Sequence, residues 1–136
     1  MVNFHEIKPG DYVIVDFEGQ RRHGEVLEVN PGDHKVYVAT DVQPFWYEVR
    51  DIYPIPLNDE ELQKLKFVKE ANIDGTVKYK KGPFRIMLER EGDFSDFEMW
   101  YREDLRQHPN VHAVHQLQNH YYDMTKVHLT NEVMVH

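Results

Sequence analysis

The sequence predicts an α+β fold in which a small curled β-barrel precedes a helix, a β-hairpin or short sheet, and a C-terminal helix. Residues 1–57 hold short runs of Val, Ile, Tyr and Phe that Pro and Gly interrupt, which is typical of short strands joined by tight turns. Residues 58–67 have a helix-capping pattern, and residues 111–124 have apolar residues at helical spacing. We therefore expect a barrel at 1–57 and an α+β segment packed on it at 58–136, with one shared core as the alternative.

Composition and charge limit the classes of protein. The chain has 136 residues, no cysteine and a formal net charge of −8. The absence of cysteine excludes disulfides, thiolate metal sites and a cysteine nucleophile. No segment has the ~18 apolar residues of a membrane span, and the N-terminal residues lack the apolar run of a signal peptide. We therefore expect a cytoplasmic protein that does not cross a membrane.

The acidic balance also argues against binding of bulk nucleic acid, because that binding is driven by Lys and Arg neutralising phosphates. Lys78, Lys80 and Lys81 form the main basic cluster, and we expect them on an exposed strand or turn.

The N-terminal part predicts four strands. We expect them at residues 12–17, 24–29, 35–40 and 45–50. The run KPGD at residues 8–11, followed by Val13 and Val15 and later by Gly24 and Val26, resembles the opening of SH3-like barrels of the KOW or Tudor kind. The resemblance implies an SH3-like barrel at 1–57.

The next segment, PLNDEELQKLKF at residues 56–67, predicts a helix. Asn58 can cap it, and Glu61 can act as the reciprocal partner of a capping box. Acidic residues in the first turn suit the positive end of the helix dipole. The residues expected to face inward are Leu62, Leu65 and Phe67.

Residues 76–104 return to a strand pattern. Apolar residues alternate at Val77 and Tyr79 and again between residues 84 and 88. Residues 91–93, EGD, form the expected hairpin loop, and apolar residues alternate again from 97 to 101. A short terminal strand is expected at 132–135.

The last helix is expected to begin at Pro109 or Asn110. At 100° per residue one side collects apolar residues and the other collects polar residues. The expected core face consists of Ala113, Val114, Leu117, Tyr121 and Met124, extended by Val111, Tyr122 and Leu129. His115 and Gln118 fall at the margin between the two faces, and Asn119 falls on the polar side.

This helix raises a choice between a metal site, a catalytic site and a polar seam in a packed core. The histidines lack the HExxH spacing of a zinc site. No nucleophile elbow, phosphate loop or carboxylate pair accompanies them, so we expect no catalysis, no metal and no cofactor. His115, Gln118 and Asn119 are better explained as a polar seam that fixes how the helix docks, and a binding groove lined by them is the functional alternative.

Two short motifs carry a further resemblance. Residues 54–57, PIPL, open a helix, and His115, Leu117, Gln118 and Asn119 follow near the C-terminus. This order resembles a group of uncharacterised small proteins of Bacteroides-type bacteria and their phages and mobile elements. The resemblance implies origin and architecture rather than an activity. That group is more hydrophobic where this chain has residues 119–128, so the resemblance does not extend to His120 or Asp123.

Phe45, Trp46 and Tyr47 form an aromatic cluster. In a strand, Phe45 and Tyr47 share one side and Trp46 takes the other. Such aromatics cage a cation or stack bases in some small barrels. The alternative, which we favour from the sequence, is that Trp46 packs between the barrel and the second half.

These observations predict a non-catalytic protein-interaction or accessory module, derived from a phage or mobile element, with an unknown protein partner. The candidate binding residues are Phe45, Trp46, Tyr47, His115, Gln118 and Asn119. One alternative is a nucleic-acid-associated SH3-like barrel, suggested by the barrel opening and by Arg21 and Arg22. A second alternative is a histidine-based metal protein.

Overall fold

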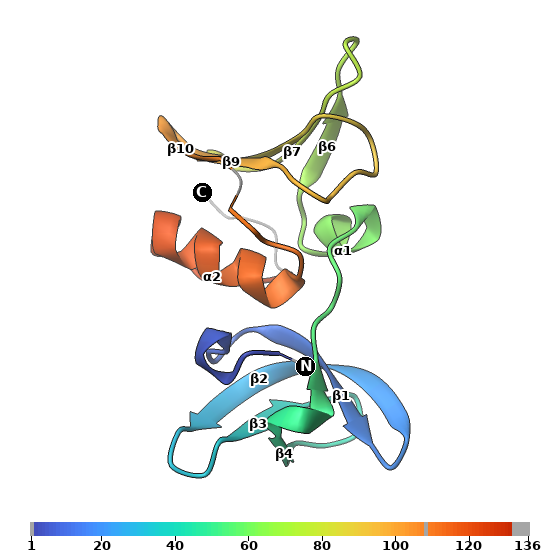
Figure 1. The fold of residues 1–136 in the computed structure, drawn as a ribbon, viewed down its shortest axis with the longest axis vertical. Helices are drawn as coiled ribbons and strands as arrows, with labels where there is room; N and C mark the ends of the chain where they lie inside the picture. Colours follow the sequence, from blue (N-terminus) through green and yellow to red (C-terminus); the bar gives the residue numbers. More distant parts are fainter. Residues whose placement is uncertain (1, 108, 132–136) are drawn as a thin grey trace. The chain divides into compact units, whose positions relative to one another are not determined.

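The structure is a computed structural model that describes residues 2–107 and 109–131 (Figure 1). The described chain is mixed α+β, with two five-stranded antiparallel sheets and two α-helices. It forms two compact units: residues 2–56 with 113–119, and residues 57–107 with 109–112 and 120–131. The α+β class is confirmed. An independent domain at 1–57 stays a prediction, and the strand expected at 132–135 lies outside the described residues.

The first unit is built around a curled sheet. Its elements are η1 (Phe4–Glu6), β1 (Tyr12–Phe17), β2 (Gln20–Asn30), β3 (Lys35–Ala39), β4 (Phe45–Glu48), η2 (Val49–Asp51) and β5 (Ile52–Tyr53). The strands lie in the order β4-β3-β2-β1-β5. This sheet curls into a half-barrel (Figure 1), and β4 and β5 form its two edges. The predicted barrel is therefore confirmed only as a curled half-barrel sheet, and its SH3-like character stays a prediction.

Alternating valines explain why the first sheet has one buried face. Val13 and Val15 on β1 are buried, as are Val36 and Val38 on β3. The core cluster consists of Val2, Ile7, Val13, Val15, Val26, Val36, Val38, Tyr47 and Ile52. Each apolar side chain buried in this way contributes about 1.5–3 kcal/mol.

Strand limits differ from the prediction by one residue at the ends of β2 (Asn30) and β3 (Ala39), and by more at the start of β2 and the end of β4. β1 has the predicted bounds, whereas β2 begins at Gln20 rather than at residue 24. Residues 20–23 are mostly exposed and so lack the apolar alternation that marks a strand in sequence. β4 ends at Glu48, because Val49–Asp51 turns into η2.

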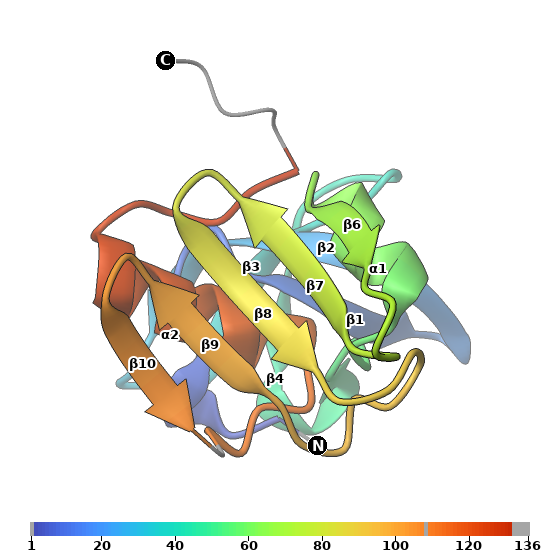
Figure 2. The same ribbon diagram turned by 90° about the horizontal axis from the view of Figure 1, so that it is seen from above.

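The second unit contains a flatter sheet and helix α1 (Figure 2). Its elements are α1 (Asp59–Lys64), β6 (Val68–Ala71), β7 (Val77–Lys81), β8 (Phe84–Leu88), β9 (Glu98–Tyr101) and β10 (Asp104–Gln107). The strand order is β10-β9-β8-β7-β6. The Asn58 side chain accepts a hydrogen bond of 2.8 Å from the Glu61 amide, so the predicted cap is confirmed. Leu62, Leu65 and Phe67 are buried as expected.

The hairpin predicted at residues 91–93 is wrong in detail. β8 ends at Leu88 and β9 begins at Glu98, so a nine-residue connection replaces a tight turn. The sequence also did not predict β6 and β10. Their sequences, VKEA and DLRQ, are mostly polar and therefore carry no clear strand pattern.

Helix α2 (Val114–Thr125) begins later than the expected Pro109 or Asn110. Asn110 has a positive φ of 55°, which an α-helix does not contain. The Val114 amide donates to the Ile55 carbonyl at 2.8 Å, and Ala113 forms a β-bridge with Pro56. These contacts hold Ala113 in an extended conformation and place the start of the helix at Val114. Tyr122, expected to extend the core face, is exposed instead.

None of the helices in the described ranges has the length and apolar content needed for a bilayer crossing.

Candidate functional site

A groove on the first unit brings together aromatic residues from two strands, β1 and β4. We call it the aromatic groove. It has a volume of about 300 Å³ and is lined by Phe17, Glu18, Gln20, Arg22, Thr40, Val42, Phe45 and Tyr47. Two of the predicted site residues, Phe45 and Tyr47, therefore line it. The sequence reasoning did not select Phe17 or Val42.

Stacked rings form the wall of the aromatic groove. Phe17 and Phe45 are stacked, with ring centroids 5.2 Å apart and an interplanar angle of 12°. Phe45 also meets Tyr47 edge-to-face at 6.5 Å. Such pairs add about 0.5–1.5 kcal/mol beyond the area they bury. Phe17 is nevertheless 46 % exposed and Val42 is 62 % exposed, so apolar surface stays in contact with water.

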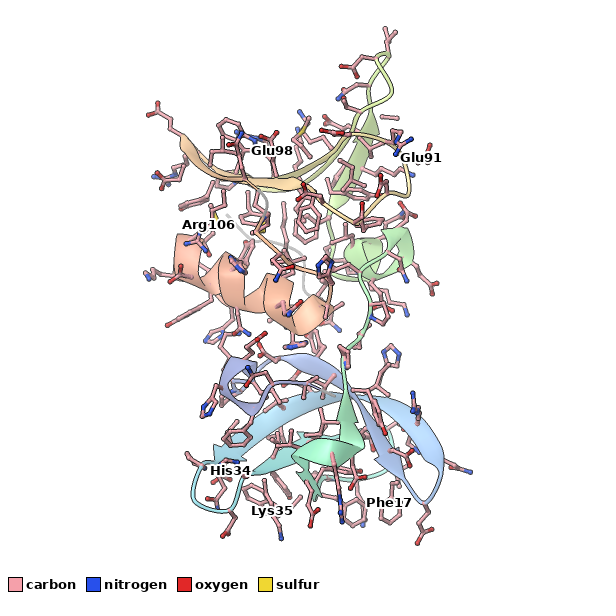
Figure 3. All side chains as sticks on the ribbon, in the orientation of Figure 1. Phe17, His34, Lys35, Glu91, Glu98 and Arg106 are labelled. Atoms are coloured by element: carbon pink, nitrogen blue, oxygen red, sulfur yellow. The ribbon has the colours of Figure 1, made fainter. Side chains whose placement is uncertain are left out.

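The β1–β2 hairpin places Phe17 at the aromatic groove, and its side chain is labelled in Figure 3. Glu18 and Gly19 at the turn have positive φ values of 53° and 81°, which is the two-residue turn that suits the twist of a hairpin. The Gly19 amide donates to Asp16 Oδ1 at 3.0 Å. The tight turn thus fixes the end of β1, where Phe17 lies.

Polar groups close one end of the aromatic groove. Arg22 donates to Asp41 Oδ1 at 3.2 Å and to Gln20 Oε1 at 2.9 Å, and this links β2 to the β3–β4 connection. Burial raises the pKa of the Tyr47 hydroxyl, and the Arg22 charge opposes that shift. Tyr47 therefore stays neutral near pH 7 and keeps an O–H donor.

Trp46 lies on the opposite face of β4 from the aromatic groove. It is 44 % exposed, and its ring lies 5.1 Å from that of Tyr37 on β3. Within the first unit Trp46 thus packs against Tyr37, and the interpretation that it lies between the two halves of the chain stays a prediction. The separation of Trp46 from Phe45 and Tyr47 onto two faces is confirmed, because β4 is a regular strand.

The polar seam on α2 binds the N-terminal loop of the same unit. Gln118 Oε1 accepts from the Tyr12 amide at 2.7 Å, and Gln118 Nε2 donates to the Gly10 carbonyl at 3.0 Å. Asn119 Nδ2 donates to the Glu6 carbonyl. Gln118 was expected at the margin of the core face but is fully buried. Its side-chain amide pairs with backbone groups of the loop, as a neighbouring strand would. These contacts favour a structural role, and ligand binding at them stays a prediction.

His115 is the least satisfied polar residue of the seam. Its side chain is 2 % exposed, and its Nδ1 atom has no hydrogen-bond partner in the described structure. Burial lowers the pKa of the imidazole, which the charge of Glu6 opposes and that of Lys8 reinforces. His115 is therefore neutral near pH 7.

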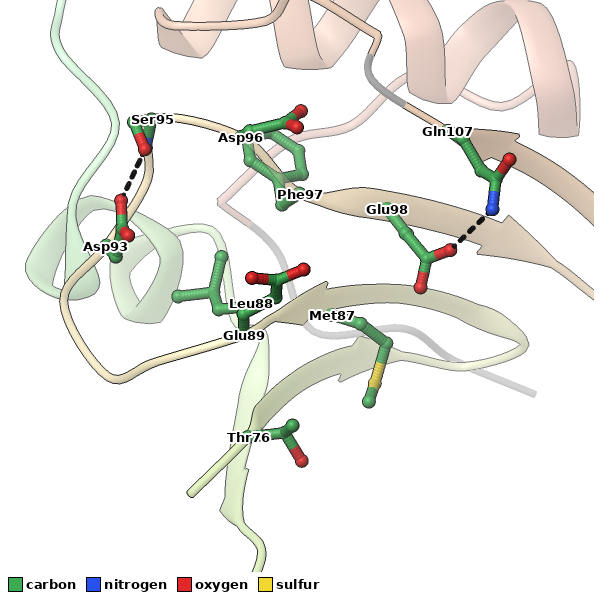
Figure 4. A pocket seen from close by; sticks show the side chains of 10 residues that line it. All are labelled: Thr76, Met87, Leu88, Glu89, Asp93, Ser95, Asp96, Phe97, Glu98 and Gln107. Atoms are coloured by element: carbon green, nitrogen blue, oxygen red, sulfur yellow. Dashed lines mark hydrogen bonds between the residues drawn. The ribbon is translucent and has the colours of Figure 1, made fainter. Parts of the chain in front are cut away.

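A second concave site lies on the second unit (Figure 4). It also has a volume of about 300 Å³, and it is lined by Thr76, Met87, Leu88, Glu89, Asp93, Ser95, Asp96, Phe97, Glu98 and Gln107. Two of its carboxylates accept hydrogen bonds from neighbouring side chains, Asp93 from Ser95 Oγ and Glu98 from Gln107 Nε2 (Figure 4). Within residues 2–107 and 109–131, no three His, Asp or Glu side chains are arranged to hold a metal ion.

The basic cluster predicted at residues 78–81 is wrong as an exposed patch. Lys81 is buried and donates to the carbonyls of Leu65 and Thr130, each at 2.8 Å. Lys78 and Lys80 both pair with Glu70, at 3.2 and 3.1 Å. Period-two alternation explains the difference, because Lys81 shares the buried face of β7 with Tyr79.

Searches with this chain found no matching family model, no matching curated protein and no matching solved structure.

Proposed function

We propose that this chain is a non-catalytic protein-interaction module whose first unit, an SH3-like half-barrel, binds a partner in the aromatic groove. The supporting observation is the apolar wall around a concave site, in which Phe17 and Val42 are exposed and Phe45 is half-buried. We also propose the origin that the PIPL and HxLQN motifs suggest, an accessory protein of a phage or mobile element.

Size and composition both support a binding groove. A volume of about 300 Å³ lies at the lower end of the range for ligand sites, and it is large enough for one or two side chains of a partner. Interfaces draw most of their affinity from a few aromatic or aliphatic anchors in such pockets. The polar groups of Arg22, Gln20 and Tyr47 can orient the backbone of the partner.

The aromatic pair of exposed Trp46 and half-buried Tyr37 also supports the nucleic-acid alternative, because single-strand binders stack bases on such rings. The basic residues that suggested it already have partners. The Arg21 guanidinium lies 4.0 Å from the Tyr53 ring centroid, and Arg22 binds Asp41. We place this alternative second. A fluorescence titration with short single strands at low salt tests it, and a flat titration would exclude it.

The primary test uses the full chain as bait for a displayed library of random twelve-residue peptides. We expect enriched peptides to lose roughly tenfold or more in affinity with Phe17→Ala, since hot-spot anchors contribute above 1 kcal/mol. Leu27→Ala is the matched control, because Leu27 is 42 % exposed on β2 and does not line the groove. A library that yields no binder, or binders indifferent to Phe17→Ala, would contradict the proposal.

A further inference from the structure

We propose that the partner of the aromatic groove is an extended, basic segment that binds as an additional strand along the free edge of β4. This inference rests on the proposed function and adds to it the conformation and charge of the ligand.

The first step is the unpaired edge. β4 is the terminal strand of its sheet and pairs only with β3, from Lys35 opposite Glu48 to Val38 opposite Phe45. No other described segment forms a ladder with it. In an antiparallel pair, alternate residues direct both backbone N–H and C=O away from the partner strand. β4 therefore presents backbone donors and acceptors that an extended peptide can satisfy, as in other strand-addition complexes.

The second step is the arrangement of apolar side chains on the two faces of β4. On one face Phe45 and Tyr47 line the aromatic groove. On the other face Trp46 lies against Tyr37 and is 44 % exposed. Successive residues of an added strand point to opposite faces. Neighbouring residues of the peptide would thus meet the aromatic groove and the Trp46–Tyr37 pair in turn.

The third step is charge. Residues 1–57 contain ten acidic and five basic residues, hence a net charge of −5. Asp41 precedes β4 and Glu48 is its last residue. Their side chains are 75 % and 50 % exposed, and each forms an ion pair, with Arg22 and Arg50 respectively. The excess of five acidic groups within residues 1–57 therefore sets the field. A basic peptide is attracted by this field, whereas a second copy of the chain is repelled. The charge therefore favours a basic partner over pairing of two β4 edges.

The test starts from peptides selected on the full chain by the library experiment. Each backbone amide of a selected peptide is N-methylated in turn, because a methyl group removes one donor without changing the side chain. We expect affinity to fall at least tenfold at every second position and to change little at the positions between. Hydrogen exchange of the β4 amides should slow on binding, and the enriched peptides should be rich in Lys and Arg.

Different results separate the two proposals. Peptides that depend on Phe17 but show no two-residue N-methyl pattern, or leave β4 exchange unchanged, would overturn strand addition and leave groove binding intact. Enriched peptides that are acidic or neutral would overturn the charge argument. The absence of any Phe17-dependent peptide would overturn both proposals.

A second copy of the chain is the competing occupant of the edge. Sedimentation of the unliganded chain tests this directly. We expect a monomer over the micromolar range. A dimer that dissociates on Trp46→Ala, with Leu27→Ala unchanged, would assign the β4 edge to self-association and overturn the inference.

Discussion

The contact between Gln118 and the N-terminal loop leads to the sharpest stability prediction. Gln118 is fully buried, and its amide spans the Tyr12 amide and the Gly10 carbonyl at 2.7 and 3.0 Å. Gln118→Leu keeps most of the volume but removes both bonds. A buried polar group that loses its partner destabilises by about 1–3 kcal/mol. Two such groups predict a loss of about 2–6 kcal/mol in the free energy of unfolding.

Urea unfolding followed by tryptophan fluorescence measures this loss. A Trp100→Phe background leaves Trp46 on β4 as the only tryptophan, so the signal reports the first unit. With a urea slope of about 2 kcal/mol per molar, the middle of the usual range for small proteins, the midpoint should fall by roughly 1–3 M. Gln43→Leu is the control, because Gln43 is an exposed residue of the same unit, and such changes stay within about 0.5 kcal/mol. Equal midpoints for the two variants would refute the reasoning.

Three further predictions concern other buried positions. Gly24→Ala places a Cβ atom 2.5 Å from Val38 Cγ1 and should destabilise the first unit by about 1–3 kcal/mol, whereas Gly32→Ala, whose nearest contact is 3.4 Å, should change little in the same urea assay. The folded pKa of His115 lies below 6.5, so the unfolded chain binds more protons and stability should fall as pH drops below about 6.5. His115→Leu should flatten this slope in a pH series of midpoints, and an unchanged slope would disprove the assignment. Lys81→Met leaves two carbonyls without their lysine donor and should lower the stability of the second unit by about 1–3 kcal/mol. Trp100 fluorescence in a Trp46→Phe background measures this loss. Unchanged stability would show that water replaces the ammonium group.

Local patterns predicted the elements whose partners lie close in sequence. Alternating valines marked β1 and β3, because each strand exposes every second residue to the same face. Asn58 marked the start of α1, because the amide that it caps is only three residues away. The polar strands β6 and β10 lack such a signal, since they are held by pairing with β7 and β9 rather than by their own apolar residues.

The residues of the candidate site also divide into those marked by local patterns and those that depend on contacts distant in sequence. Phe45, Trp46 and Tyr47 were predicted as a split aromatic cluster, because alternation along one strand is a local property. Phe17 was missed, because it meets Phe45 only when the sheet curls and brings the β1–β2 hairpin to β4. In the second unit, Arg106, labelled in Figure 3, likewise has partners distant in sequence, which are His120 and Asp123 of α2.

The amino-acid sequence by itself therefore determined the α+β class, the faces of the main strands, the capped helix and the absence of thiol chemistry. These depend on residue type and on spacings of two to four positions. Only the tertiary structure decided that Gln118 is a buried partner of Tyr12, 106 positions away, that Lys81 is buried and that Trp46 is exposed at an edge. Those properties depend on which distant backbone groups and faces meet once the sheets form.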